Sequence, residues 1–151
     1  MEHPLSQFKY CPECGFNPSS ATVALIVNEK NELLVCRRAK DPAKGTLDLP
    51  GGFIDMGETG EEGVAREEME ETGLVVKEVV YQFTLPNIYI YSGFPVHTLD
   101  MFYLCKVENT DHLSAMDDAA DAFFMPVSEI DPDQFGLGSI RKGLVKFLTT
   151  F

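Results

Sequence analysis

The chain has 151 residues and a formal net charge of −12, with 44% hydrophobic residues, 11 Phe and 5 Tyr. This length and composition predict one folded domain and exclude a disordered chain. The charge disfavours duplex nucleic acid and membrane surfaces as partners, and the lack of a long apolar run or signal-like N-terminus favours a cytoplasmic protein.

The first feature along the chain is a Cys-x₂-Cys pair, Cys11 and Cys14, with the spacing of a zinc knuckle. A structural Zn²⁺ needs four ligands, so two more would come from a homodimer partner's pair, or from His3 and another group. The alternative is a remnant that binds no metal. We therefore divide the chain into an N-terminal segment, residues 1–19, and a domain, residues 20–151.

Several apolar, β-branched segments separated by turn residues predict short strands. The first two, at 21–27 and 33–38, flank a turn at 28–31 and are expected to form a hairpin. Cys36 and Cys105 fall inside such strands and are interpreted as small buried hydrophobic residues. The remaining strands are expected at 47–49, 75–85, 98–107 and 122–125.

A helix is predicted from about Gly60 to Thr72. Thr59 followed by Glu62 has the spacing of a capping box, and Gly73 is placed to end the helix in a left-handed conformation. The buried stripe of this helix is expected to consist of Ala65, Met69, Thr72 and the neighbouring Val64.

Eight carboxylates crowd this helix and the loop before it, against one basic residue, Arg66. Glu67, Glu70 and Glu71 have the spacing that brings their carboxylates onto one helix face. Three hard oxygen ligands predict a Mg²⁺ or Mn²⁺ site. Arg66 lies four residues from both Glu62 and Glu70 and is expected to hold one of them.

A turn or short helix is expected at 128–130, followed by a helix from Gly138. Strands interrupted by one central and one terminal helix predict a sheet with helices on both faces. The core-packing face of the terminal helix is expected to contain Ile140, Leu144, Phe147 and Leu148.

The acidic segment resembles the Nudix box, G-x₅-E-x₇-R-E-U-x-E-E-x-G-U, in which U is aliphatic. The one departure is Glu68, where the motif has an aliphatic residue. A merely solvated acidic helix is the alternative, but such a helix needs no loop like Pro50-Gly51-Gly52, which lets backbone approach a ligand closely. Eight of the nine specified positions match, namely Gly52, Glu58, Arg66, Glu67, Glu70, Glu71, Gly73 and Leu74.

The resemblance implies an α/β (α+β) fold, a Nudix-type α/β/α sandwich with a mixed β-sheet. It also implies hydrolysis of a nucleoside diphosphate linked to another moiety, catalysed with Mg²⁺ (or Mn²⁺). Glu67, Glu70, Glu71 and the Gly51 carbonyl would hold the ion, and Arg66 would orient the glutamates. The general base would be a box glutamate or one of three acids in the loop 113–121, namely Asp117, Asp118 and Asp121.

Substrate contacts are expected outside the box. Arg37 and Arg38 would contact phosphate, unless they belong to an ordinary polar strand end. Tyr89 or Tyr91, in a predicted loop at 87–97, would stack a base or ribose, unless they pack in the core. The CPECG element partially resembles the zinc ribbon of NADH pyrophosphatases, which favours NADH, whereas the family in general favours ADP-ribose or a sugar nucleotide.

Two other functions share the implied fold. One is a sensor that binds ADP-ribose or a nucleotide sugar without turnover, and retention of all three box glutamates argues against it. The other is allylic diphosphate isomerisation, which needs a cysteine and a glutamate around an isoprenoid pocket, with Cys36 or Cys105 as the thiol.

Overall fold

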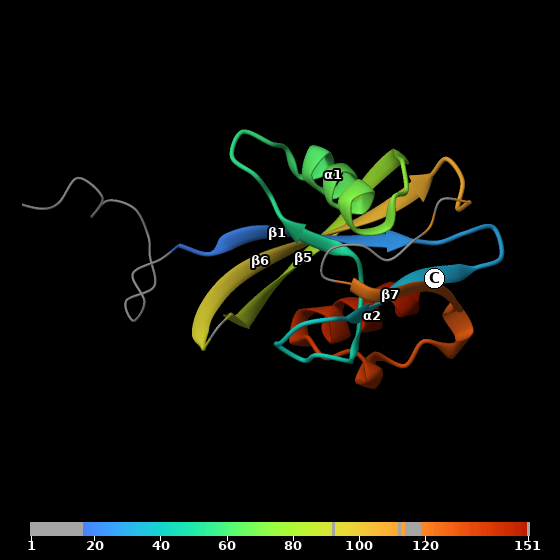
Figure 1. The fold of residues 1–151 in the computed structure, drawn as a ribbon. Coiled ribbons are helices and arrows are strands. Elements are labelled where there is room, and N and C mark those ends of the chain that lie inside the picture. Colours follow the sequence, from blue (N-terminus) through green and yellow to red (C-terminus); the bar gives the residue numbers. More distant parts are fainter. Residues whose placement is uncertain (1–16, 92, 112, 114–118, 151) are drawn as a thin grey trace, which may run out of the picture.

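The computed structural model describes residues 17–91, 93–111, 113 and 119–150. Two β-sheets form its middle layer, with helix α1 (Gly60–Thr72) on one side and helix α2 (Gly138–Thr150) on the other (Figure 1). The predicted α/β/α sandwich with a mixed sheet is confirmed. In the described part of the chain, no helix is long and apolar enough to cross a membrane.

The larger sheet has the strand order β4-β1-β6-β5, in which β1 and β6 run parallel and the other neighbours are antiparallel. The smaller sheet, β3-β2-β7, is antiparallel. Two short 3-10 helices, Val127–Glu129 and Pro132–Gln134, connect β7 to α2. The strands are β1 (Ser19–Ile26), β2 (Glu32–Arg38), β3 (Leu47–Asp48), β4 (Gly51–Phe53), β5 (Val76–Tyr91), β6 (Phe94–Val107) and β7 (Ala119–Pro126).

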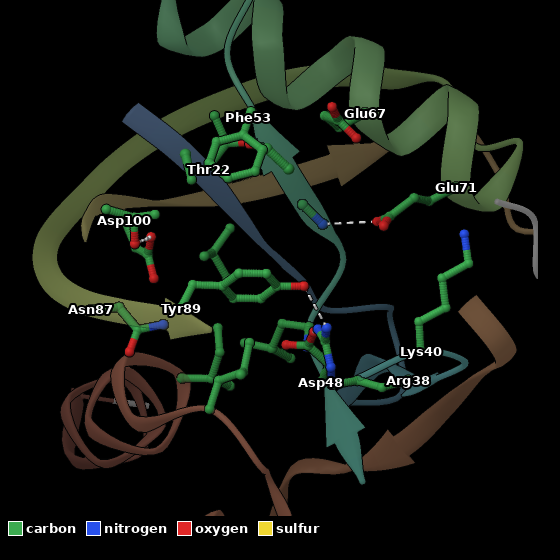
Figure 2. Close-up of a pocket in the computed structure, with 18 of the residues that line it drawn as sticks. Thr22, Arg38, Lys40, Asp48, Phe53, Glu67, Glu71, Asn87, Tyr89 and Asp100 are labelled. Carbon is green, nitrogen blue, oxygen red and sulfur yellow. Dashed lines mark hydrogen bonds and ion pairs between the residues drawn. The ribbon is translucent and has the colours of Figure 1, made fainter. Parts of the chain in front are cut away.

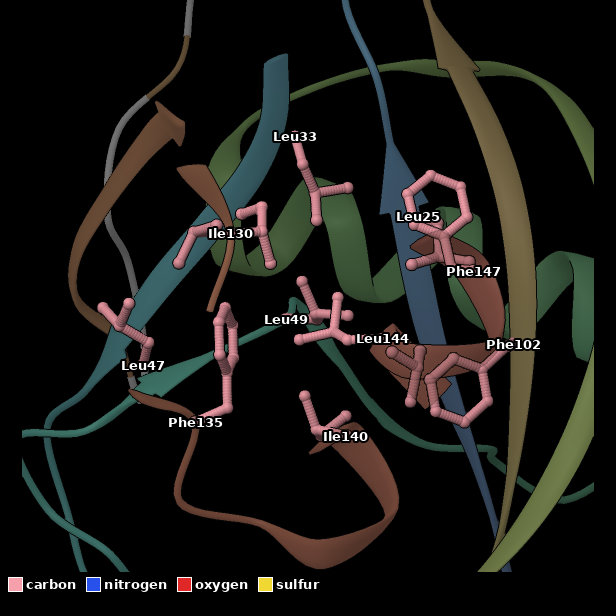
Figure 3. Close-up of a cluster of buried hydrophobic side chains, with 12 residues drawn as sticks. Leu25, Leu33, Leu47, Leu49, Phe102, Ile130, Phe135, Ile140, Leu144 and Phe147 are labelled. Carbon is pink, nitrogen blue, oxygen red and sulfur yellow. The ribbon is translucent and has the colours of Figure 1, made fainter. Parts of the chain in front are cut away.

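Strand β1 serves two cores, because successive side chains of a strand point to opposite faces. Val23 and Leu25 belong to the cluster that packs against α2 (Figure 3), whereas Ala24 and Ile26 belong to the cluster that includes α1. Burial on both faces explains why residues 23–26 of this strand are all apolar.

Helix α2 buries the predicted face: Ile140, Leu144 and Phe147 are almost fully inaccessible. Gly143 lies in the same contact, where an added Cβ would come within 2.4 Å of the Phe102 ring. The absence of a side chain there lets the helix approach the sheet closely.

The hairpin expected from 21–27 and 33–38 is wrong. After a single bridge between Val27 and Leu33, β1 and β2 diverge into different sheets. Strand β1 has partners on both edges, β6 on one and β4 on the other. The partner β4 contains Gly51 and Gly52, which were expected in a loop.

The loop expected at 87–97 is also wrong, because these residues form the outer half of a long β5–β6 hairpin. Asn87 pairs with Thr98, and the pairing continues to Tyr91 opposite Phe94. Gly93, with φ of 79°, provides the left-handed conformation that the tight turn requires.

Helix α1 begins and ends where the sequence predicts. The Thr59 hydroxyl accepts a hydrogen bond from Glu62 N at 3.0 Å, and the Glu62 carboxylate accepts one from Thr59 N at 3.0 Å. Gly73 is left-handed, with φ of 74°, and its N–H donates to the Met69 carbonyl. Local hydrogen bonds therefore define both helix ends.

The buried stripe of α1 differs from the prediction by about one residue. Val64, Glu68 and Thr72 are fully buried, whereas Met69 is 45% exposed. Glu68 thus occupies the interior position at which the Nudix box has an aliphatic residue. Neither of its carboxyl oxygens has a hydrogen-bond partner in the described structure. Burial raises the pKa of Glu68 well above its ordinary value, and the nearby Glu71 and Glu67 add to the effect.

Candidate active site

A cavity of about 630 Å³ lies where α1 faces the β5–β6 hairpin and the loop before β3. Helix α1 contributes Glu67, Glu70 and Glu71 to its lining, and β4 contributes Gly51 and Gly52. Figure 2 shows Glu67 and Glu71 projecting from the helix toward the same space. The structure therefore brings the three predicted metal ligands to one pocket.

Arg66 is the centre of the hydrogen-bond network beside this pocket. Its guanidinium binds both oxygens of Glu58, at 2.8 and 2.9 Å. Its Nη1 atom donates to Glu67 at 3.0 Å and to Glu70 at 3.2 Å. The expected contact with Glu70 is present, whereas the bidentate partner is Glu58 and the carboxylate of Glu62 caps the helix.

These contacts set the electrostatics of the network. The hydrogen bonds from Arg66, together with that from the Asp55 backbone N–H, lower the pKa of Glu58 to about 2. Burial raises the pKa of Glu67 despite its contact with Arg66. Glu58 therefore stays ionised and anchors the arginine that holds two of the proposed ligands.

The third glutamate is held by backbone. The N–H of Gly51 donates to Glu71 Oε2 at 2.9 Å, which links β4 to the end of α1. Gly52 lies directly beneath Glu67, and an added Cβ would come within 2.4 to 2.6 Å of that carboxyl group. The Pro50-Gly51-Gly52 segment thus brings backbone against the glutamates.

The donor set fits a hard divalent cation. Within the described residues, no three His, Cys, Asp or Glu side chains converge on a single point as they stand. Glu67 and Glu70 nevertheless already share one cationic atom, Arg66 Nη1, and Glu71 lies on the same pocket. Carboxylate oxygens are the ligands that Mg²⁺ and Mn²⁺ prefer.

The Gly52 contact yields a prediction. We expect Gly52→Ala to displace the Glu67 carboxylate and to lower kcat/KM at subsaturating Mg²⁺ by about 10- to 100-fold, the usual cost of disturbing the groups that orient a ligand. Gly138→Ala is the matched control, because a Cβ there meets its nearest atoms at 3.7 and 3.8 Å, ordinary contact distances. Equal activity of the two variants would contradict this role for Gly52.

Arg38 and Tyr89 line the pocket, but other groups of the protein already bind the Arg38 guanidinium. Arg38 binds Asp48 at 2.7 Å, the Tyr89 hydroxyl at 2.8 Å and the Pro42 carbonyl at 2.6 Å. Arg38 was predicted to contact phosphate, but these contacts favour a role in holding Tyr89 in place. Arg37 lies outside the lining and donates to the Gly45 carbonyl.

The other predicted residues are not in the pocket or are not described. Asp121 is exposed at the start of β7, accepts a hydrogen bond from Ala122 N and does not line the cavity. Asp117 and Asp118, the Tyr91 side chain, and the Cys11 and Cys14 pair lie outside the described part. Zinc binding and a homodimer therefore stay predictions from sequence.

Several pocket residues were missed by the sequence reasoning, notably Asn87, Thr98 and Asp100. Thr98 and Asp100 are 5% and 6% exposed. The available signal was two polar residues, spaced by two, at the start of an otherwise apolar strand, because that spacing places both on one face.

The two described cysteines are buried, as predicted, and neither lines the pocket. Burial raises the pKa of both thiols, that of Cys105 to about 12. The thiol required for isomerisation is therefore absent from the described part of the site. This result argues against the isomerase function.

We expect the folded protein with Cys11→Ser and Cys14→Ser to react negligibly with Ellman's reagent at pH 8. Thiolate is the reactive form, and burial disfavours it at both remaining cysteines. In guanidinium chloride the same protein should release two equivalents per chain. Rapid reaction of either thiol in the native protein would show that one of them is accessible.

Comparison with known proteins identifies the family of this chain. The family model of the NUDIX domain matches residues 17–146. The ADP-ribose pyrophosphatase of Methanocaldococcus jannaschii is 32% identical over 81% of this chain and 70% of its own length. The NAD-capped RNA hydrolase NudC of Chromobacterium violaceum is 33% identical over 50% of this chain, but only 29% of that protein is spanned.

The fold matches as well. The crystal structure of a MutT NUDIX hydrolase from Burkholderia pseudomallei superposes with a TM-score of 0.73 and 22% identity, covering 85% of this chain and 97% of that one. On the domain match and the identity to the archaeal protein, the chain belongs to the Nudix hydrolase family of pyrophosphohydrolases.

Proposed function

We propose that this protein hydrolyses the diphosphate of a nucleoside diphosphate linked to another moiety, with Mg²⁺ or Mn²⁺ as the required ion and ADP-ribose as the first substrate to test. The observation that carries the proposal is the position of Glu67, Glu70 and Glu71 on one cavity together with Tyr89. The cavity volume lies within the range of small-molecule sites.

The charge of the pocket supports a metal requirement. Seven acidic and two basic residues of the described chain line it. Such a surface repels a diphosphate, which carries negative charge on every phosphoryl group. A divalent cation held by Glu67, Glu70 and Glu71 would neutralise the diphosphate and activate the attacking water.

The side chains around the glutamates would prepare the site before substrate binds. Arg66, anchored on Glu58, holds Glu67 and Glu70, and the Gly51 N–H holds Glu71. We propose that one of the box glutamates accepts the proton of the attacking water. Asp121 is exposed and does not line the cavity, which favours the box glutamates over this loop acid.

ADP-ribose leads the candidate substrates because the archaeal relative bears the name ADP-ribose pyrophosphatase. NADH follows, from the partial resemblance of the N-terminal CPECG element to the NADH pyrophosphatases. Tyr89 offers an aromatic face in the pocket, on which a base could stack.

The test is a panel of ADP-ribose, NADH and nucleotide sugars, incubated with the protein in Mg²⁺ or in EDTA. Mass spectrometry of the products identifies the substrate and the bond cleaved. We expect Mg²⁺-dependent release of nucleoside monophosphate. Tight binding of one compound without turnover would favour the sensor function, and neither binding nor turnover across the panel would refute the proposal.

A further inference from the structure

Three polar residues gather on the inner face of the β5–β6 hairpin. Asn87 and Thr98 are cross-strand partners, and Asp100 follows Thr98 by two residues on the same face. All three line the cavity. Figure 2 shows Asp100 and Asn87 across the pocket from Glu67 and Glu71. The cavity therefore has a second polar end, which the proposed metal chemistry does not use.

Asp100 is held rigidly at this end. One carboxylate oxygen accepts a hydrogen bond from the Thr98 hydroxyl at 2.8 Å, and the other accepts one from the Ser139 hydroxyl at 2.5 Å. Ser139 is the second residue of α2, so the positive end of that helix also favours a negative charge here. Both contacts leave the carboxylate with a fixed orientation.

The same carboxylate retains capacity for a ligand. Each oxygen has two acceptor positions, and each uses one of them within the described structure. Asp100 forms no ion pair with a described basic residue, although only 6% of it is exposed. A buried carboxylate that lines a pocket is costly unless hydrogen-bond donors satisfy it.

We propose that Asp100 is a specificity-determining residue that accepts two hydrogen bonds from the nucleoside end of the substrate. The inference rests on the proposed function, because it assigns the diphosphate to the glutamate end. The matching ligand chemistry is a pair of adjacent donors. Such a pair occurs on a purine edge that bears N–H groups and on the vicinal hydroxyls of ribose. Thr98 and Ser139 are positioning residues for this carboxylate.

The test measures binding with α,β-methylene analogues of purine nucleoside diphosphates, in Mg²⁺, by calorimetry. Because the analogues resist hydrolysis, the result does not depend on turnover. GDP and IDP analogues differ by the 2-amino group, ADP and purine-riboside analogues by the 6-amino group, and 2′-deoxy forms lack one ribose hydroxyl. The diphosphate is common to all, so differences report on the nucleoside end.

We expect Asp100→Asn to weaken the best analogue by about 10- to 100-fold, since the amide replaces one acceptor by a donor. If the base supplies the donors, the variant loses discrimination by the amino group. If the ribose supplies them, it loses discrimination against the 2′-deoxy form. Thr98→Val retains the Asp100 carboxylate and should cause a smaller loss of affinity with the same pattern. This second variant keeps the test decisive if Asp100→Asn does not fold.

Equal affinities of wild type and both variants for every analogue would overturn the assignment of Asp100. A uniform loss of affinity, with the ratios between analogues unchanged, would do so as well, because it indicates a structural role. If the analogues show the expected pattern but no member of the substrate panel is hydrolysed, the proposed reaction fails and the nucleoside subsite stands.

Discussion

Replacement of Glu71 by glutamine is expected to lower kcat by about 10²- to 10³-fold and to leave the fold intact, the usual loss when one preorganised electrostatic contact is removed. Glutamine has nearly the same shape, and its carbonyl oxygen can still accept the hydrogen bond from the Gly51 N–H. The substitution therefore removes a charge from the proposed metal site without removing the contact between β4 and α1.

Steady-state hydrolysis over a Mg²⁺ titration, with thermal unfolding as the check on the fold, measures this effect. Glu61→Gln is the matched control, because Glu61 is exposed on the same helix and does not line the cavity. The control should retain wild-type kcat. Wild-type turnover by Glu71→Gln at all Mg²⁺ concentrations would refute the proposed role of this carboxylate.

Replacement of Glu68 by leucine is expected to stabilise the protein and to raise Tm by about 2–12 °C at pH 8. The side chain is fully buried, and its oxygens lack hydrogen-bond partners in the described structure. An unsatisfied buried polar group costs about 1–3 kcal/mol, and a domain of this size gains about 2–4 °C in Tm per kcal/mol. Leucine would restore the aliphatic residue of the Nudix box.

The pH dependence separates the charge from the packing. Burial keeps Glu68 protonated in the folded chain at pH values where the unfolded chain, with a pKa near 4.5, has lost the proton. The stability contributed by this carboxyl is therefore fully present below about pH 4.5. It falls by about 1.4 kcal/mol per pH unit above that value, until the pH passes the raised pKa of the folded state.

Glu68→Gln cannot ionise, so its advantage over the wild type should grow with pH above about 4.5. Chemical unfolding in EDTA between pH 4 and 8 measures this difference for the metal-free protein. Glu61→Gln again serves as the control, because it removes a carboxyl from the exposed face of the same helix. A Tm of Glu68→Leu at or below the wild-type value would show that the carboxyl has a stabilising partner in the folded chain.

Helix α1 shows which structural features local sequence signals predict and which they do not. Its ends follow from Thr59, Glu62 and Gly73, because the hydrogen bonds that cap a helix join residues a few positions apart. The residues on its buried face did not follow from such local signals. The periodicity was compatible with Met69 inward, and packing against the sheet rotated the stripe so that Glu68 is buried instead.

Strand partners were less accessible to sequence reasoning. Residues 87–97 contain turn-forming and aromatic residues alike, and only their pairing in the β5–β6 hairpin decided that they form strands. Likewise, β1 does not form a hairpin with β2, because β4 and β6 pair with its two edges. Such pairings join residues far apart in the chain, so single-segment propensity does not specify them.

The amino-acid sequence by itself determined the Nudix box, the capped helix that bears Glu67, Glu70 and Glu71, and the apolar strands around it. Each of these depends on residue spacing over a few turns or on local hydrogen bonds. The tertiary structure alone decided that Arg66 is anchored by Glu58, that Glu68 is buried, and that Asp100 shares a cavity with the glutamates. These arrangements arise where separate elements pack together, and burial and pairing at such contacts depend on the whole fold.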